Sequence, residues 1–167
     1  MLKDRGLRGH FLSAGYPAAR IYSIEADPEN FSLLEKNTAS EPRIRPIHAC
    51  VVGARQATVT FSNEGPAWGR RRTAGSGTAV PGLTLDELLA RFAISRIDLL
   101  KLDIEGGERE VLARGHYLDV VDHIVAELHY GYGFTEFQQD VEAHGLAARA
   151  ADAKCGAITA HRLPRSG

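Results

Sequence analysis

The sequence predicts an α/β fold with a mostly parallel sheet and an antiparallel edge formed by the C-terminal strands. The first observation behind this prediction is an alternation of short β-branched runs with stretches whose apolar residues recur at helical spacing. The second is that helix-start signals directly follow several of these runs. The third is that the last two runs follow one another without a helix between them, which is typical of an antiparallel pair.

The predicted strands are short and rich in Ile, Leu and Val. The clearest is I-D-L-L-K-L-D-I at 97–104, which leads into a glycine pair. Parallel strands need crossover connections, and helical patterns occupy several of the intervals between these runs. The full set of predicted strands covers residues 19–25, 44–52, 57–61, 97–104, 122–128, 146–151 and 156–162.

The first predicted helices begin at recognisable capping residues. Asp27 and Pro28 start a helix that runs to about Thr38, because aspartate caps helices and proline suits the first helical position. Thr84 and Glu87 form a capping box, and the helix after them carries an apolar stripe on one side. The residues of that stripe are Leu85, Leu88, Leu89 and Phe92.

Further helices and one long loop complete the predicted organisation. A short helix covers 108–113. A last helix is capped by Thr135 and Gln138 and ends at Gly145, a residue suited to the left-handed position after a helix. Residues 62–82 are predicted to be a flexible loop, because they carry no periodic pattern and contain glycines, prolines and an arginine triplet.

Composition places the chain among ordinary globular proteins. Of its 167 residues, 44% are hydrophobic and 25% charged, and we expect a single domain over residues 1–167. The formal net charge of −1 gives no overall attraction for nucleic acid. No apolar run approaches the roughly 18 residues that a membrane span needs. Cys50 and Cys155 are too few for a disulfide framework, which favours the reducing cytoplasm.

Polar side chains gather where the predicted strands end. In an open α/β sheet, ligands bind at the carboxyl ends of the strands, and alternate residues of one strand share a face. The side chains that meet both conditions are Glu25, Asp103, Glu105, Glu127 and His129. A semi-buried carboxylate is costly without a partner, so the set as a whole predicts a functional site.

Each of these residues also has a purely structural interpretation. Glu25 could be a solvated strand end. Asp103 and Glu105 could cap the helix that follows them, where the helix dipole favours negative charge. A single histidine such as His129 is more often structural than catalytic. The convergence of the side chains, and no one of them alone, favours a function.

Four segments carry a resemblance to a known family. They are I-Y-S-I-E-A-D-P-E-N-F-S-L-L-E-K-N at 21–37, T-L-D-E-L-L at 84–89, D-L-L-K-L-D-I-E-G-G-E at 98–108 and A-E-L-H at 126–129. Over residues 19–129 the chain resembles the FkbM-type methyltransferases. The resemblance implies a Rossmann-like class I fold that binds S-adenosylmethionine and methylates a hydroxyl oxygen of a small molecule, sugar or lipid.

The resemblance also implies which residues bind the cofactor. Glu25 would hold the two hydroxyls of the ribose, to which carboxylate oxygens are suited as acceptors. Ala49, Cys50 and Val51 would lie along the adenine. Asp103 and Glu105 would face the methionine end of the cofactor and the acceptor.

A hydroxyl acceptor must lose its proton, and His129, Asp103 and Glu105 are the candidate bases. His129 is favoured, because an imidazole ordinarily titrates near neutral pH. Selection of the acceptor would fall to residues 62–82 and to the turn at 130–134.

The beginning of the chain departs from the family's pattern. The family opens with a central strand and a D-x-G-A-N-x-G loop, whose glycines let the backbone approach the cofactor. Here D-R-G-L-R-G at 4–9 matches only its first part. We therefore expect that the first strand is missing and that Met1 is an internal start. We also expect strands 19–25 and 97–104 either to pair directly or to leave a gap, because buried backbone groups need partners.

Three other functions stay open. A nicotinamide-dependent oxidoreductase would require a G-x-G-x-x-G loop, which the sequence lacks. A truncated relative could act as a binding module without activity. A hard divalent cation such as Mg²⁺ or Mn²⁺ would suit a set of carboxylates with one imidazole. The residues of that set are Asp103, Glu105, Glu127 and His129.

Overall fold

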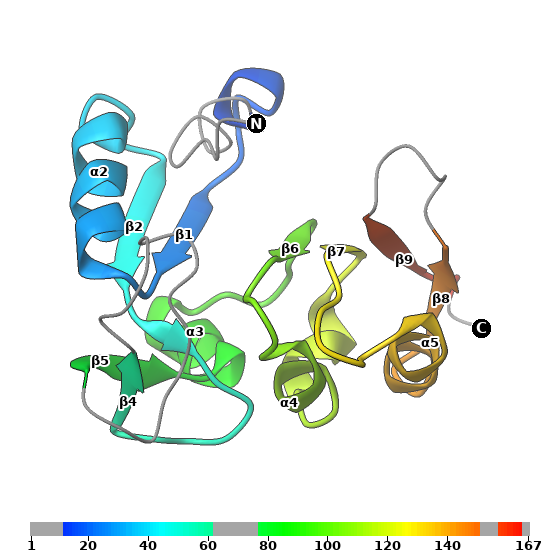
Figure 1. The fold of residues 1–167 in the computed structure, drawn as a ribbon. Coiled ribbons are helices and arrows are strands. Elements are labelled where there is room, and N and C mark those ends of the chain that lie inside the picture. The colour runs from blue at the N-terminus through cyan, green and yellow to red at the C-terminus, as the bar shows by residue number, and fades with distance from the viewer. Residues whose placement is uncertain (1–11, 62–76, 151–156, 165–167) are drawn as a thin grey trace. The chain divides into compact units, whose positions relative to one another are not determined.

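The structure of the chain is a computed structural model that describes residues 12–61, 77–150 and 157–164. The chain divides into two compact units, each of which is described by itself below. Strands and helices follow one another along the chain, as Figure 1 shows, and the predicted combination of helices with parallel and antiparallel strands is confirmed. The single, mostly parallel sheet is not: the described strands belong to more than one sheet, and antiparallel pairs are as prominent as parallel ones. The first unit comprises Met1–Cys50 and Gln56–Gly82, and the second comprises Val51–Arg55 and Leu83–Gly167.

The first unit is built around a strand–helix–strand segment. β1 (Ile21–Glu25) pairs in parallel with β2 (Ile44–His48), and α2 (Pro28–Thr38) connects them (Figure 1). Glu25 and His48 lie opposite each other at the ends of the two strands. The predicted crossover is therefore present, and it brings the carboxyl ends of β1 and β2 to the same edge.

α2 begins as the sequence predicts. Asp27 accepts hydrogen bonds from the backbone N–H groups of Glu29 and Asn30, each at 3.0 Å. Leu34 is buried, and Phe31 stacks on the ring of His48 with 4.8 Å between ring centroids. The apolar side of the helix thus packs toward its own strand pair.

An antiparallel pair also belongs to this part of the chain. β4 (Thr58–Phe61) pairs with β5 (Thr78–Leu83), and Thr58 lies opposite Pro81. Residues 78–82 therefore form a strand where the sequence predicted a loop. The sequence does not predict this strand because it contains Pro81 and Gly82, and both residue types usually interrupt a strand. The rest of the predicted loop, residues 62–76, lies outside the described residues.

The second unit contains a four-stranded sheet. β6 (Leu100–Leu102) pairs in parallel with β7 (His123–Ala126). β9 (Ile158–Arg162) runs antiparallel to β7, and β8 (Leu146–Arg149) runs antiparallel to β9. The strand order is β6-β7-β9-β8, so the predicted antiparallel C-terminal edge is confirmed.

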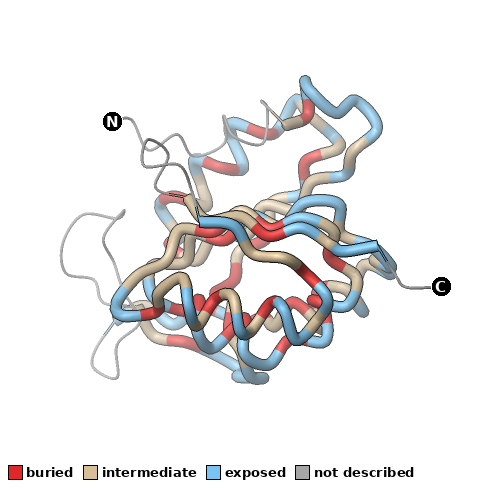
Figure 2. The backbone as a smooth tube through the Cα atoms, turned by 90° about the vertical axis from the view of Figure 1, so that its right-hand side faces the viewer, coloured by how far each residue is buried: buried red, intermediate tan, exposed pale blue. Residues whose placement is uncertain are grey.

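Helices supply the remaining core of the second unit. They are α3 (Leu85–Phe92), α4 (Glu108–Leu112), the 3₁₀ helix η2 (His116–Val120) and α5 (Phe134–Glu142), and β3 (Cys50–Val51) leads from the first unit into the second. Figure 2 shows buried positions recurring along the helices with exposed positions between them. None of the helices among the described residues has the length and apolar character needed to cross a bilayer. The fully buried apolar side chains of this unit include Leu112, Leu118, Phe137, Val141 and Leu146.

The capping box at the start of α3 is confirmed. The Thr84 hydroxyl accepts a hydrogen bond from the Glu87 N–H at 3.1 Å, and the Thr84 N–H donates to the Glu87 carboxylate at 3.0 Å. Leu85 and Leu88 of the predicted stripe are buried. The helix ends at Ala93, whose backbone is left-handed with φ 51°.

α5 begins differently from the prediction. Its N-cap is Gly133, whose N–H donates to the Glu136 carboxylate at 3.1 Å, so Thr135 and Gln138 do not cap the helix. Gly133 and Glu136 have the same three-residue spacing as Thr135 and Gln138, which is the spacing of a capping box. The helix begins with the first pair, two residues earlier than predicted. The helix ends earlier than predicted, with Ala143 as its C-cap, but Gly145 is left-handed with φ 74° as expected.

Strands 19–25 and 97–104 do not pair with each other. Among the described residues, β1 pairs with β2 and β6 pairs with β7, in separate sheets. Ile97 makes only an isolated bridge to Val121, so the regular part of the predicted strand 97–104 is shorter than expected. Direct pairing of these two strands was one of two expected outcomes, and it is wrong.

Candidate active site

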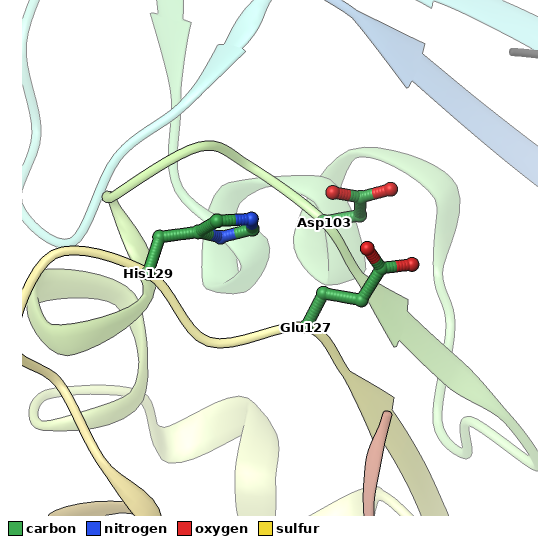
Figure 3. Close-up of side chains that lie close together, drawn as sticks. All are labelled: Asp103, Glu127 and His129. Carbon is green, nitrogen blue, oxygen red and sulfur yellow. The ribbon is translucent and has the colours of Figure 1, made fainter. Parts of the chain in front are cut away.

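Three polar side chains meet where β6 and β7 end. Asp103 directly follows β6, Glu127 directly follows β7, and His129 lies two residues further on. A carboxylate oxygen of each acid and a ring nitrogen of His129 all lie within 4.8 Å of one another. Figure 3 shows the imidazole pointing toward the two carboxylates. The alternation of side chains along parallel strands predicted this convergence.

Lys101 supplies a positive charge to this cluster. Its Nζ lies 3.2 Å from a carboxylate oxygen of Asp103 and 3.7 Å from one of Glu127. The three side chains of Asp103, Glu127 and His129 are of the kinds that divalent cations bind. In this structure, however, the ammonium group of Lys101 lies beside both carboxylates and offsets one of their two negative charges. The geometry therefore describes an ion-paired cluster.

Glu105 lies at the margin of the cluster. Its carboxylate is 3.9 Å from Nε2 of His129 and is not one of the three groups that lie within 4.8 Å of one another. Glu105 and Gly106 form a left-handed turn, with φ 52° and 103°. A Cβ at Gly106 would lie 2.6 Å from the Tyr130 ring. The absence of a side chain at Gly106 therefore allows the ring to pack against the turn.

Glu108 is a site residue that the strand-end reasoning missed. It is the first residue of α4, and its side chain is fully buried. One carboxylate oxygen, Oε1, lies 2.8 Å from Nδ1 of His129. The other, Oε2, has no hydrogen-bond partner among the residues that the structure describes. The signal available in the sequence was the last acid of the D-I-E-G-G-E segment, which falls on a helix and not on a strand end.

The contact with Glu108 defines the roles of the two imidazole nitrogens. An ionised carboxylate can only accept hydrogen bonds, so we assign the proton to Nδ1 of His129. Nε2 then carries the lone pair on the side of Glu105. The side chain of His129 is 24% exposed, so this nitrogen belongs to a group that solvent can reach. The arrangement can accept a proton from a bound hydroxyl.

The turn after His129 is held by α4. Arg109 donates a hydrogen bond to the carbonyl of Gly131 at 3.1 Å, and its guanidinium lies 5.1 Å from the centre of the Tyr132 ring. The Tyr132 hydroxyl donates to Asp140 at 2.6 Å. Burial and this hydrogen bond to a carboxylate raise the pKa of Tyr132 far above its ordinary value, so it stays a neutral donor. Tyr130, by contrast, is largely exposed.

The other residues expected to bind the cofactor lie at the end of β1 and just after β2. They are Glu25, Ala49 and Cys50 in the first unit and Val51 in the second. Glu25 is the last residue of β1, and its carboxylate accepts a hydrogen bond from the Asp27 N–H at 2.9 Å. The Ala49 N–H donates to the Glu25 carbonyl at 3.2 Å, which places these two residues side by side. Ala49 and Cys50 are buried, and Val51 is half-buried. Asp27 uses its own carboxylate to cap α2.

Comparison with known proteins gives one match. The model of a family described as the methyltransferase FkbM domain matches residues 10–152, well over half of the chain. Neither the curated proteins nor the solved structures contain a match to the sequence. The matched range includes both groups of residues described above, the pair at the end of β1 and the cluster at the ends of β6 and β7.

Proposed function

Because the chain belongs to the family of FkbM methyltransferase domains, we propose that it transfers a methyl group from S-adenosylmethionine to a hydroxyl oxygen of a small molecule, sugar or lipid. The family membership expected from the sequence is confirmed, and the family indicates methyltransferase activity. The methyl donor, the oxygen acceptor and the Rossmann-like class I form of the fold are parts of the proposal. The observation that carries the hydroxyl acceptor is the unprotonated Nε2 that we assign to His129.

The chemistry of the residues at the strand ends fits the methyl donor. The Glu25 carboxylate would accept hydrogen bonds from the ribose hydroxyls. Ala49, Cys50 and Val51 would lie along the adenine, and the first two are buried apolar residues. Asp103 would face the charged methionine end.

Proton removal falls to the second unit in this proposal. When bound, the donor supplies an electrophilic methyl group, whose bond to sulfur breaks with the electron pair left on sulfur as the bond to the acceptor oxygen forms. His129 takes the hydroxyl proton on Nε2. The carboxylates of Asp103 and Glu105 are the alternative bases and can accept hydrogen bonds from neighbouring hydroxyls.

The test separates binding from transfer. Calorimetry with S-adenosylmethionine measures binding, and release of labelled methyl to a panel of alcohols, phenols and sugars measures transfer. We expect Glu25→Ala to weaken binding. We expect His129→Ala to leave binding intact and to lower turnover about 10²- to 10⁴-fold, the range for loss of a general base.

His144→Ala is the matched control, because His144 pairs with Asp119 and stands outside the cluster. It should retain turnover. No binding of S-adenosylmethionine by the wild-type chain would overturn the proposal. Equal turnover in His129→Ala and wild type would remove His129 from the reaction and leave Asp103 and Glu105 as the candidate bases.

A further inference from the structure

We propose that Glu108 is a positioning residue that makes His129 the base, by holding a proton on Nδ1 and by stabilising the imidazolium that forms when Nε2 takes up the acceptor proton. This inference rests on the proposed function. It assigns a task to an acid that no strand-end or cofactor role explains.

The burial of Glu108 is the first support. α4 turns Glu108, Val111 and Leu112 inward, and all three are buried. An acid thus occupies a position where an apolar residue would cost nothing in desolvation. A buried carboxylate is costly unless a partner compensates its charge. Among the described residues, the partner of Glu108 is His129.

The second support is that the two imidazole nitrogens face different surroundings. Nδ1 faces the buried carboxylate of Glu108 at 2.8 Å, whereas Nε2 lies 3.9 Å from the half-exposed carboxylate of Glu105. A proton on Nδ1 is therefore held away from solvent, and proton exchange is left to Nε2. This division of roles is that of a carboxylate–histidine pair in acid–base catalysis.

Other charged groups surround the ring, and Glu108 differs from them. The carboxylates of Asp103 and Glu127 both lie beside the Lys101 ammonium, and both are partly exposed. Glu108 acts on Nδ1 alone and from the protein interior. The charged groups that face His129 or its neighbours are Lys101, Asp103 and Glu105 from β6 and its turn, Glu127 from β7 and Glu108 from α4.

The local backbone explains how Glu108 reaches the ring across 21 positions of sequence. Gly106, at φ 103°, turns the chain after β6, and Gly107 is the buried N-cap of α4. The Val111 N–H then donates to the Gly107 carbonyl at 3.1 Å, which starts the helix at Glu108. The glycine pair thus precedes the helix whose first side chain, that of Glu108, contacts Nδ1 of His129.

Imidazole nitrogen NMR tests the pair directly on the free protein. We record ¹H–¹⁵N spectra of wild type and identify the His129 signals by their loss in His129→Ala. We expect one tautomer, with the proton on Nδ1. In Glu108→Gln the charge is lost at nearly constant volume, and we expect a mixture of tautomers. Glu110→Gln, an exposed acid of the same helix, should leave the signals unchanged.

Kinetics test the consequence for catalysis. Glu108→Gln should lower kcat about 10²-fold while KM for the acceptor and the Kd for S-adenosylmethionine stay the same. The acidic limb of its pH–rate profile should move to lower pH, because the charge that favours the protonated ring is gone. In the His129→Ala background, Glu108→Gln should cause no further loss, because Glu108 acts through His129.

The outcomes separate this inference from the proposed function. A proton on Nε2 in the wild-type spectrum overturns the pairing, and this measurement needs no variant to fold. A further loss of kcat in the double variant also overturns it. If the wild-type chain transfers no methyl group, the proposed function fails, while the NMR result still decides whether Glu108 fixes the tautomer.

Discussion

Replacing Gly106 with alanine should damage the site in a way that stability alone does not reveal. Gly106 has φ 103°, a conformation that side-chain-bearing residues rarely adopt. Forcing alanine into such a conformation costs about 1 to 3 kcal/mol. The new Cβ would also lie 2.6 Å from the ring of Tyr130. Because Tyr130 is 58% exposed, its ring can move aside, so the clash should displace Tyr130 and add little to the unfolding free energy.

Gly145→Ala is the matched control for the backbone cost. Gly145 also has positive φ, at 74°, but a Cβ there meets only an ordinary contact, 3.7 Å from Arg162. Denaturant unfolding should therefore give both variants similar losses of about 1 to 3 kcal/mol. Only Gly106→Ala should raise KM for the acceptor, because Tyr130 neighbours His129 with 5.9 Å between ring centroids. An unchanged KM in Gly106→Ala, or an equal rise in Gly145→Ala, would refute this reasoning.

Two further predictions concern charge. Hydrogen bonds from Arg43 lower the pKa of Glu41 from 4.5 to about 2, so this pair stabilises the fold above pH 4.5 and loses its effect as the pH falls toward 2. Glu41→Gln should therefore lower the denaturant midpoint at pH 7 and lower it much less near pH 2; an effect independent of pH would contradict this. At the cluster, activity should survive complete chelation of divalent cations, because the Lys101 ammonium already pairs with both Asp103 and Glu127. Loss of activity with EDTA, restored by Mg²⁺ or Mn²⁺, would instead favour the metal interpretation.

Local chemistry allowed the sequence to predict much of the fold. The Thr84–Glu87 capping box and the Asp27 cap each depend on residues that are close in sequence, and both are present. Strand parity also predicted that Asp103, Glu127 and His129 would meet, because the carboxyl ends of parallel neighbours share an edge.

The parts that the sequence did not predict depend on competition or on distant contacts. β5 contains Pro81 and Gly82, which usually break strands, and only its pairing with β4 shows that the segment is extended. At α5, two capping patterns overlap, and the Arg109–Glu136 ion pair at 3.6 Å supports the one at Gly133. Glu108 was missed because its burial follows from the packing of α4 and not from a local motif.

The charge imbalance of the cluster has a consequence for product release. Four carboxylates, those of Asp103, Glu105, Glu108 and Glu127, share their surroundings with one ammonium group, that of Lys101. Under the proposed function, such a field attracts a sulfonium, which carries a positive charge on sulfur, more strongly than the neutral thioether left after transfer. The same residues would thus bind the sulfonium donor more tightly than the thioether product. Added salt would screen these charges and reduce the difference between the affinities for donor and product.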